Sequence, residues 1–259
     1  MKNIFRLGVL VTALLSVISC GKGIENDYKY IKSNGVLRIG ITEFPPMNYH
    51  DADDNLIGFD TEFAKEVCAE LGLDAEFIDI NWDLRDKELE KKNIDCIWNG
   101  TTLTEREEKL SITQPYIASK EVLIAKQSRI QELEESLDNA VISVEAGSTG
   151  ELITLFIQDD IHINLADSQL HAIYDVESGA ADAAVIDYLM LHGGIGTDSL
   201  FKDLVMSERP MSADEVMVVA FRKKSNMTSK VNKIITKMKK NGTLAEIARK
   251  YGIEKLLIH

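Results

Sequence analysis

The sequence predicts an α/β fold in two lobes, each with a central, mostly parallel sheet flanked by helices. Short apolar runs of strand-like composition alternate with segments of helical periodicity, and this alternation is typical of a largely parallel sheet. The 259 residues exceed the size at which single cores stop growing, about 250 residues. Residues 113–126 and 212–216 are long enough to carry the chain from one unit to the other and back, and two crossings allow a hinge.

In the first half, the predicted order is strand, loop, helix, strand, helix, strand. Pro45 and Pro46 mark the loop. The first helix has Asp60 as its predicted N-cap, apolar residues at spacings of four, and Gly72 as its end. The predicted strands cover residues 35–42, 75–80 and 95–99, and the predicted helices cover residues 60–71 and 84–92.

The second half repeats this pattern. Its predicted strands cover residues 121–126, 140–144, 161–165 and 183–187, with helices from about residue 150 and over residues 168–178. A last strand over residues 215–221 precedes two C-terminal helices, which are split at Asn241 and Gly242.

The N-terminus resembles a secretory signal. Lys2 and Arg6 precede an apolar stretch over residues 7–18 that is too short to span a bilayer. The stretch ends in VISC, which resembles a bacterial lipobox, with cleavage before Cys20 leaving that thiol for diacylation. We therefore expect residues 1–19 to be a lipoprotein signal peptide, residues 20–27 to be a tether, and the lipids to hold the protein on a membrane surface. An ordinary signal peptide with an incidental cysteine is the alternative.

The charge of the chain argues against nucleic acid as a partner. The 29 basic residues include Lys2 and Arg6, so 27 remain after residue 19, against 42 acidic residues and a net charge of −15. A protein that binds phosphate backbones usually carries the opposite charge. No internal run of about twenty apolar residues occurs, which excludes a polytopic membrane protein.

The sequence offers no strong metal, nucleotide or catalytic motif. Residues 51–62 place acidic residues at several positions of a calcium loop, but Leu56 stands where the bend requires glycine, so we predict an ordinary acidic turn. Cys68 and Cys96 lie in apolar patterns and are predicted to be buried thiols, with a disulfide between them as the alternative. The histidines lack metal-ligand spacing. We therefore expect neither a cofactor nor a metal.

Eight motifs, in order and with matching separations, are similar to those of the amino-acid-binding family of extracellular solute-binding proteins that serve ABC importers. They are GVLRIG, FPPMNY, LIGFDTEFAKEV, IDCIWNGTTLTERE, QPY, VEAGSTGE, GAADAAVIDY and NGTLAEIARKYG. The resemblance implies a periplasmic-binding-protein-like fold of type II, with the ligand between two lobes. Lobe 1 would comprise residues 28–117 and 217–259 and lobe 2 residues 120–213, with hinges near residues 117–120 and 212–216.

The resemblance also implies how the two groups common to all amino acids are held. Arg106, in a motif one residue shorter than the family form, would hold the carboxylate through two parallel bonds. A helix N-terminus would assist it, and an acid with neutral oxygens would hold the ammonium. The remaining candidates are Ser148 and Thr149 for the carboxylate, and Asp187, the Gly100 carbonyl and the Thr102 hydroxyl for the ammonium. A surface ion pair for Arg106, a plain turn at Ser148 and an N-cap at Asp187 are the alternatives.

The resemblance brings four further positions to the pocket. Phe44 would be an aromatic contact with the ligand's side chain or ammonium, with a core aromatic as its alternative. Arg85, Asn99 and Glu145 are all polar, and unpaired buried polar groups are costly around an apolar ligand. They therefore predict a polar or charged amino acid, with solvated rim residues as the alternative. Trp98 is expected to pack beneath its strand.

We interpret the sequence as a monomeric, lipid-anchored binding protein that works outside the cytoplasmic membrane with an ABC permease and ATPase. No catalysis is expected. The alternatives are an enzyme of the cyclohexadienyl-dehydratase type, with Glu145 as its extra acid or base, and a ligand-sensing module whose partner is a receptor.

Overall fold

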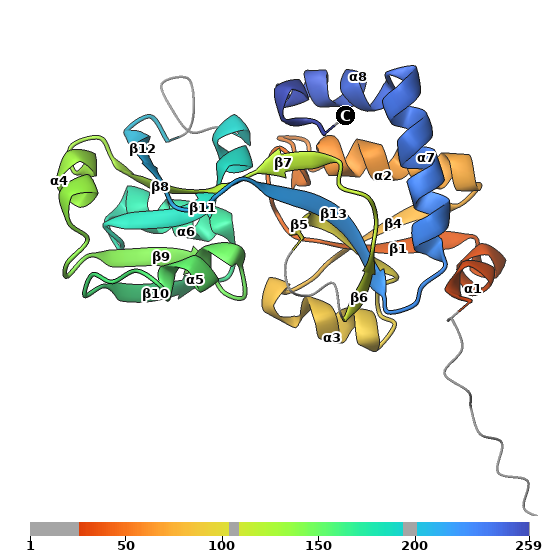
Figure 1. The fold of residues 1–259 in the computed structure, drawn as a ribbon, viewed down its shortest axis with the longest axis horizontal. Coiled ribbons are helices and arrows are strands. Elements are labelled where there is room, and N and C mark those ends of the chain that lie inside the picture. The colour runs from red at the N-terminus through yellow and green to blue at the C-terminus, as the bar shows by residue number, and fades with distance from the viewer. Residues whose placement is uncertain (1–25, 104–108, 194–200, 259) are drawn as a thin grey trace, which may run out of the picture.

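The structure is a computed structural model that describes residues 26–103, 109–193 and 201–258. The predicted signal peptide over residues 1–19, Cys20 and Arg106 lie outside the described residues. Two sheets with helices on both faces form two lobes side by side (Figure 1). Within the described ranges, no helix has the length and apolar character needed to cross a membrane.

The sheet of lobe 1 combines parallel and antiparallel strands. Its strands are β1 (Val36–Ile41), β4 (Asp74–Asp79), β5 (Cys96–Thr102), β6 (Leu110–Ile112), β7 (Ile117–Ser119) and β13 (Glu215–Arg222). Their order is β4-β1-β5-β13-β6, with β7 also paired to β13. β4, β1 and β5 run parallel, whereas β13 is antiparallel to each of its partners.

Helices cover both faces of this sheet. They are α1 (Asp27–Asn34), α2 (Phe59–Leu71), α3 (Arg85–Glu90), α7 (Met227–Asn241) and α8 (Thr243–Lys250), with 3-10 turns η1 (Trp82–Leu84) and η4 (Glu254–Leu256). Side chains along β5 alternate between the faces. Trp98 packs edge-on against Phe63 of α2, with ring centroids 5.0 Å apart, and Ile97 packs with Leu89 of α3. Trp98 therefore lies beneath the strand, as predicted.

Lobe 2 has the same arrangement. Its strands are β8 (Glu121–Lys126), β9 (Val141–Glu145), β10 (His162–Ala166), β11 (Ala183–Asp187) and β12 (Leu204–Pro210), and its helices are α4 (Ile130–Glu135), α5 (Thr149–Thr154), α6 (Gln169–Ser178) and the 3-10 turn η3 (Tyr188–Gly193). The strand order is β10-β9-β11-β8-β12. β10, β9 and β11 are parallel, and β8 is antiparallel to β11 and β12.

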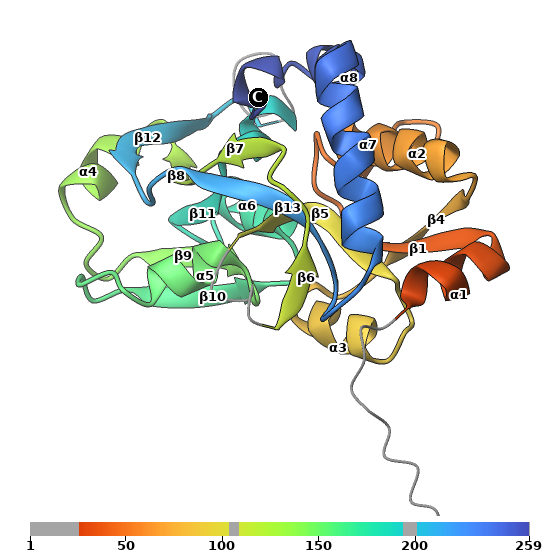
Figure 2. The ribbon, with the colours of Figure 1, turned by 45° about the vertical axis from the view of Figure 1, so that its right-hand side comes forward.

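The chain passes between the lobes twice. β7 ends at Ser119 in one sheet and β8 begins at Glu121 in the other, so Lys120 alone separates them. The return runs from β12 to β13 over residues 211–214. Both views show these two connections lying side by side between the lobes (Figure 2).

The structure corrects some of the predicted elements. Asp60 is not the N-cap of α2, because the helix begins at Phe59 after Gly58 and the Asp60 side chain is buried. The sheets are mostly parallel, as predicted: in each, only the strand that carries a crossing, β8 or β13, runs against the others. The elements α1, α4, β6 and β12 and the short hairpin of β2 (Tyr49–His50) with β3 (Leu56–Ile57) were not predicted. Cys68 and Cys96 are buried and free, which agrees with the predicted thiols and not with the alternative disulfide.

Candidate functional site

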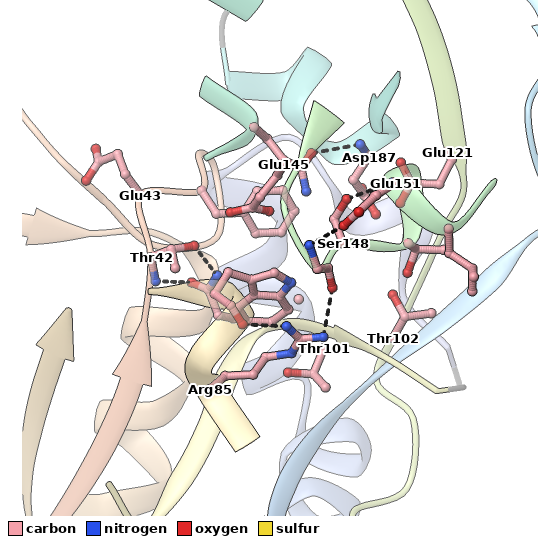
Figure 3. A pocket seen from close by; sticks show the side chains of 18 of the residues that line it. Thr42, Glu43, Arg85, Thr101, Thr102, Glu121, Glu145, Ser148, Glu151 and Asp187 are labelled. Atoms are coloured by element: carbon pink, nitrogen blue, oxygen red, sulfur yellow. Dashed lines mark hydrogen bonds between the residues drawn. The ribbon is translucent and has the colours of Figure 1, made fainter. Parts of the chain in front are cut away.

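A cavity of about 810 Å³ lies between the two lobes (Figure 3). Nine of the ten predicted ligand-binding residues belong to the described part of the chain, and all nine line this cavity: Phe44, Arg85, Asn99, Gly100, Thr102, Glu145, Ser148, Thr149 and Asp187. Arg106, the tenth, lies outside the described residues. Residues from both lobes therefore share one space, as a site between two lobes requires.

Gly100 shapes the lobe 1 wall at the end of β5. Its φ is +59°, in the left-handed region that favours glycine. A Cβ at this position would lie 2.3 Å from Cε1 of Phe44, so only glycine leaves room for the ring. Phe44 therefore packs against the peptide whose carbonyl is expected to accept a bond from the ligand's ammonium.

Asp60 fixes this strand end from inside lobe 1. Its Oδ2 accepts hydrogen bonds from the N–H of Gly100 and from Oη of Tyr116, both at 3.0 Å. Burial raises the pKa of Asp60 to about 7, against the opposing effect of these hydrogen bonds. The carboxyl group thus joins the Gly100 motif to the QPY motif that contains Tyr116.

The amide of Asn99 is engaged within lobe 1. Its Oδ1 accepts from the N–H of Thr42 at 3.0 Å and from Nδ2 of Asn48 at 2.8 Å, and its Nδ2 donates to Oγ1 of Thr42 at 2.6 Å. Asn99 therefore lines the cavity while it holds the loop after β1 against β5.

Arg85 contacts both lobes. Its guanidinium donates to the carbonyl of Trp82 and, at 2.9 Å, to the carbonyl of Gly147 in lobe 2. It also lies over the indole of Trp82, 4.4 Å from the ring centroid. With 3% of the residue exposed, the guanidinium is held by backbone carbonyls and an aromatic face. Arg85 thus connects the two walls directly.

Asp187 and Glu121 form a pair of carboxyl groups on the lobe 2 wall (Figure 3). They are direct partners in the antiparallel ladder of β11 and β8. Oδ1 of Asp187 accepts from Oγ of Ser119 at 2.5 Å and from the N–H of Leu189 at 2.8 Å. Asp187 therefore caps the turn that follows it, the alternative role, and also lines the cavity. Burial raises the pKa of Asp187 to about 7, and burial beside Asp187 raises the pKa of Glu121 well above its usual range.

Glu145 is the third buried carboxyl group of this wall. It ends β9, is 4% exposed and is hydrogen-bonded to the side chain of Gln169. Its Oε1 has no hydrogen-bond partner among the described residues. Burial raises the pKa of Glu145 to about 8. Because Oε1 of Gln169 accepts from the N–H of Asp187 at 2.8 Å, Gln169 links Glu145 to the Asp187 pair.

The loop after Glu145 turns directly into α5. Ser148 is the N-cap, and its Oγ accepts from the N–H of Glu151 at 3.1 Å. Oε2 of Glu151 accepts in turn from the N–H of Gly147 at 2.5 Å. The sequence, a serine followed three residues later by glutamate, is that of a capping box, but the Glu151 carboxylate accepts from Gly147, one residue before the cap. This turn places Ser148 and Thr149 on the cavity wall.

The lining is richer in acids than the sequence predicted. Its described residues include five carboxyl groups, Glu43, Glu121, Glu145, Glu151 and Asp187, and two cationic side chains, Arg85 and Lys109. Glu121 was missed although one signal was present: it opens an apolar strand directly after the predicted crossing, and a charge in such a run is unusual. Trp82 and Gln169 also line the cavity, and no comparable signal distinguishes them in the sequence.

Comparisons with known proteins agree with this architecture. The model of the bacterial extracellular solute-binding proteins, family 3, matches residues 37–254. The chain is 28% identical to the L-cystine-binding protein TcyA of Bacillus subtilis (strain 168), with 93% of this chain and 94% of that protein covered. It is 26% identical to the arginine-binding extracellular protein ArtP of the same strain, with 94% and 96% covered.

Among solved structures, the chain resembles the ancestral amino acid-binding protein AncCDT-1, a precursor of cyclohexadienyl dehydratase. The TM-score is 0.76 at 25% sequence identity, and the match covers 87% of this chain and 99% of that one. The two-lobed fold is thus one that amino-acid-binding proteins use.

Proposed function

The chain belongs to family 3 of the bacterial extracellular solute-binding proteins, and from this premise we propose that it captures an amino acid between its lobes and delivers it to an ABC importer. Its place of action is outside the cytoplasmic membrane, and its partners are the permease and ATPase of the importer. The observation that carries the proposal is the cavity of about 810 Å³ lined from both lobes by the predicted contact residues.

The proposed contacts follow from the two charges that every amino acid carries. The Asp187 carboxylate, the Gly100 carbonyl and the Thr102 hydroxyl meet the ammonium, which needs several acceptors. The carboxylate meets Arg106 and the start of the helix at Ser148 and Thr149.

The ligand's side chain is proposed to be polar or charged. Phe44, Arg85 and Glu145 line the remaining wall, and an apolar ligand would leave the unpaired Oε1 of Glu145 buried without a partner. The names of TcyA and ArtP give L-cystine and arginine as their ligands, and neither ligand is apolar.

A thermal-shift screen of the twenty amino acids on the purified protein tests this function. We expect a stabilising shift with one or a few polar or charged amino acids, because a ligand that binds only the folded state raises its stability. A screen in which no amino acid raises the unfolding temperature would contradict the proposal.

We further propose that the protein acts as a monomer. We also propose that lipids on Cys20 attach it to the membrane, and the VISC motif supports this anchor. Metabolic labelling with a palmitate analogue should mark the native protein and leave Cys20→Ala unmarked. Label on the variant, or none on the native protein, would show that the anchor is elsewhere or absent.

The protein is proposed to perform no chemistry, but one observation supports a second candidate. Glu145 is a buried carboxyl group with a pKa raised to about 8, a suitable general acid or base, and AncCDT-1 is a precursor of an enzyme. Incubation with prephenate or arogenate followed by product analysis separates the two functions. Product that is lost in Glu145→Gln would favour the enzyme.

A further inference from the structure

Glu121 lines the cavity but has no part in the contacts proposed so far. It is the first residue of β8, is 4% exposed and faces Asp187 directly across the ladder. Its N–H donates to Oγ of Ser212 at 2.9 Å, so the return crossing fixes its backbone. Its carboxyl oxygens receive no hydrogen bond from the described residues.

None of the described groups around Glu121 compensates its charge. The charged neighbours that act on it are Asp187, Glu215 and Glu145, all carboxyl groups that disfavour its ionised form. Lys120, the adjacent residue, has its ammonium over the ring of Tyr188, 5.5 Å from the centroid. A buried carboxyl group without a partner is costly, and such groups are concentrated at functional sites.

Glu145 is a second buried carboxyl group that lacks a partner. It is also 4% exposed and lines the same cavity, and its Oε1 is a buried acceptor without a partner in the described part of the chain. The cationic side chains of the described lining form no ion pair with Glu145: Arg85 donates to two backbone carbonyls, and Lys109 is exposed.

The charge of the ligand decides whether these acids find partners. The ammonium and the carboxylate of an amino acid cancel, and in the proposed contacts Asp187 already takes the ammonium. Glu121 and Glu145 then remain. With a neutral or acidic side chain, the described residues supply no counter-charge and burial keeps both carboxyl groups protonated. A side chain that ends in a guanidinium or an ammonium offers donors and the opposite charge.

We propose that Glu121 is a further ligand-binding residue and that, together with Glu145, it makes the cleft select an amino acid with a cationic side chain. This inference rests on the proposed capture of an amino acid. Phe44 and Trp82 in the same lining present aromatic faces, against which a cationic side chain binds favourably.

The test compares ligands whose side chains differ in charge. Calorimetric titration measures L-arginine against L-citrulline, which replaces the guanidinium by a neutral urea, and L-lysine against L-norleucine, which lacks the side-chain ammonium. For the wild-type protein, one cationic probe should bind about 100-fold or more tightly than its neutral partner, the effect typical of a buried charge that loses its counter-charge.

Two variants assign that preference to residues. Glu121→Gln and Glu145→Gln keep the size of the side chain and remove its charge, and each should reduce the preference at least about tenfold. The control Glu135→Gln changes an exposed glutamate of α4 in the same lobe and should leave the preference unchanged. Thermal unfolding of each variant checks that it folds.

Each outcome decides one part of the inference. A wild-type protein that binds other amino acids, but neither cationic probe more tightly than its neutral partner, overturns the selectivity while the proposed function stands. A preference that survives in folded Glu121→Gln overturns the role of Glu121. A protein that binds no amino acid contradicts the proposed function itself.

Discussion

Gly100, Phe44 and Asp60 together determine the lobe 1 side of the cavity. The left-handed backbone of Gly100 turns the end of β5, the ring of Phe44 occupies the space beside it, and Asp60 holds its N–H. The ammonium is expected to bind the carbonyl of the same residue, so small changes here should reach the ligand directly.

Replacing Gly100 with alanine should therefore weaken both folding and binding. A non-glycine residue in the left-handed region costs about 1–2 kcal/mol, and the new Cβ would also meet Phe44 at 2.3 Å. The matched control is Gly179→Ala, because Gly179 has a φ of +83° but nothing within 4 Å of an added Cβ. Urea unfolding and calorimetric titration should show a larger loss for Gly100→Ala. Equal losses would mean that Phe44 yields without cost.

The buried carboxyl group of Glu145 should make stability depend on pH. Burial raises its pKa from 4.5 to about 8, so between these values the folded state binds more protons than the unfolded state. Stability without ligand should therefore fall as the pH rises from about 4.5 to about 8. Each unit of pKa shift corresponds to about 1.4 kcal/mol.

Glu145→Gln should remove its share of this fall. Urea unfolding of the ligand-free protein at pH 5 and pH 8 should give a smaller difference for Glu145→Gln than for the wild type, with the exposed-site variant Glu135→Gln behaving as the wild type. The same difference in all three proteins would show that Glu145 does not titrate in this range.

Nine of the twenty described lining residues were predicted from the sequence, but the contacts that some of them make were not. Asn99 was expected to face the ligand, yet its amide bonds to Thr42 and Asn48, partners more than fifty positions away that spacing does not reveal. Asp60 was predicted to be an N-cap because its actual partners, Gly100 and Tyr116, are also distant in the sequence. Glu121 becomes part of the site only through its register with Asp187, which depends on the pairing of β8 with β11.

Among the elements, the contact between the start of α3 and the loop after β9 connects the lobes without the ligand. Arg85, the first residue of α3 directly after η1, donates to the carbonyl of Gly147. A Cβ added to Gly147, whose φ is +73°, would lie 3.0 Å from Oδ1 of Asp83 and 3.2 Å from Nη1 of Arg85. This close approach requires the lobes to be near each other, so the contact favours the closed arrangement.

Arg85→Ala should lower the affinity for every amino acid that binds, by a similar factor for each. The variant loses a contact made only when the lobes are close, and a smaller closed population reduces all affinities alike. Loss of a direct contact with the ligand's side chain would instead change the order of preference. Calorimetric titration with two ligands distinguishes these results, and Arg249→Ala, which removes an exposed arginine paired with Glu254, is the control.

The elements that were predicted followed from the sequence because long apolar runs and helix ends are local signals. The strand over residues 121–126, the strand over residues 183–187 and the split of α7 from α8 at Gly242 are as predicted. α1 was missed because it buries little apolar surface, with Ile31 as its buried apolar residue. β12 was missed because its partner, β8, lies more than seventy residues earlier in the chain.

The whole molecule has the form of a clamp, with the cavity between its two lobes. Two similar sheets are joined by two neighbouring connections, an arrangement that suits a hinge. A ligand that bonds to Asp187 in one lobe and Gly100 in the other gains contacts that an open molecule lacks, so it should favour closure.

Closure predicts a change in overall size. Small-angle scattering should give a smaller radius of gyration at saturation with the amino acid selected by the thermal-shift screen than in its absence. Addition of an amino acid that the screen rejects provides the control. An identical radius with and without the selected ligand would argue against a hinged clamp.

Calorimetric titration of the selected amino acid into the wild type, Asp187→Ala and Arg106→Ala tests whether the protein holds the amino acid by both of its common charges. If the amino acid is held between the lobes by its two common charges, binding should saturate at one ligand per chain. Removal of one partner from a buried ion pair costs about 3–5 kcal/mol, so each variant should bind hundreds to thousands of times more weakly. Unchanged affinity in both variants would contradict this mode of binding.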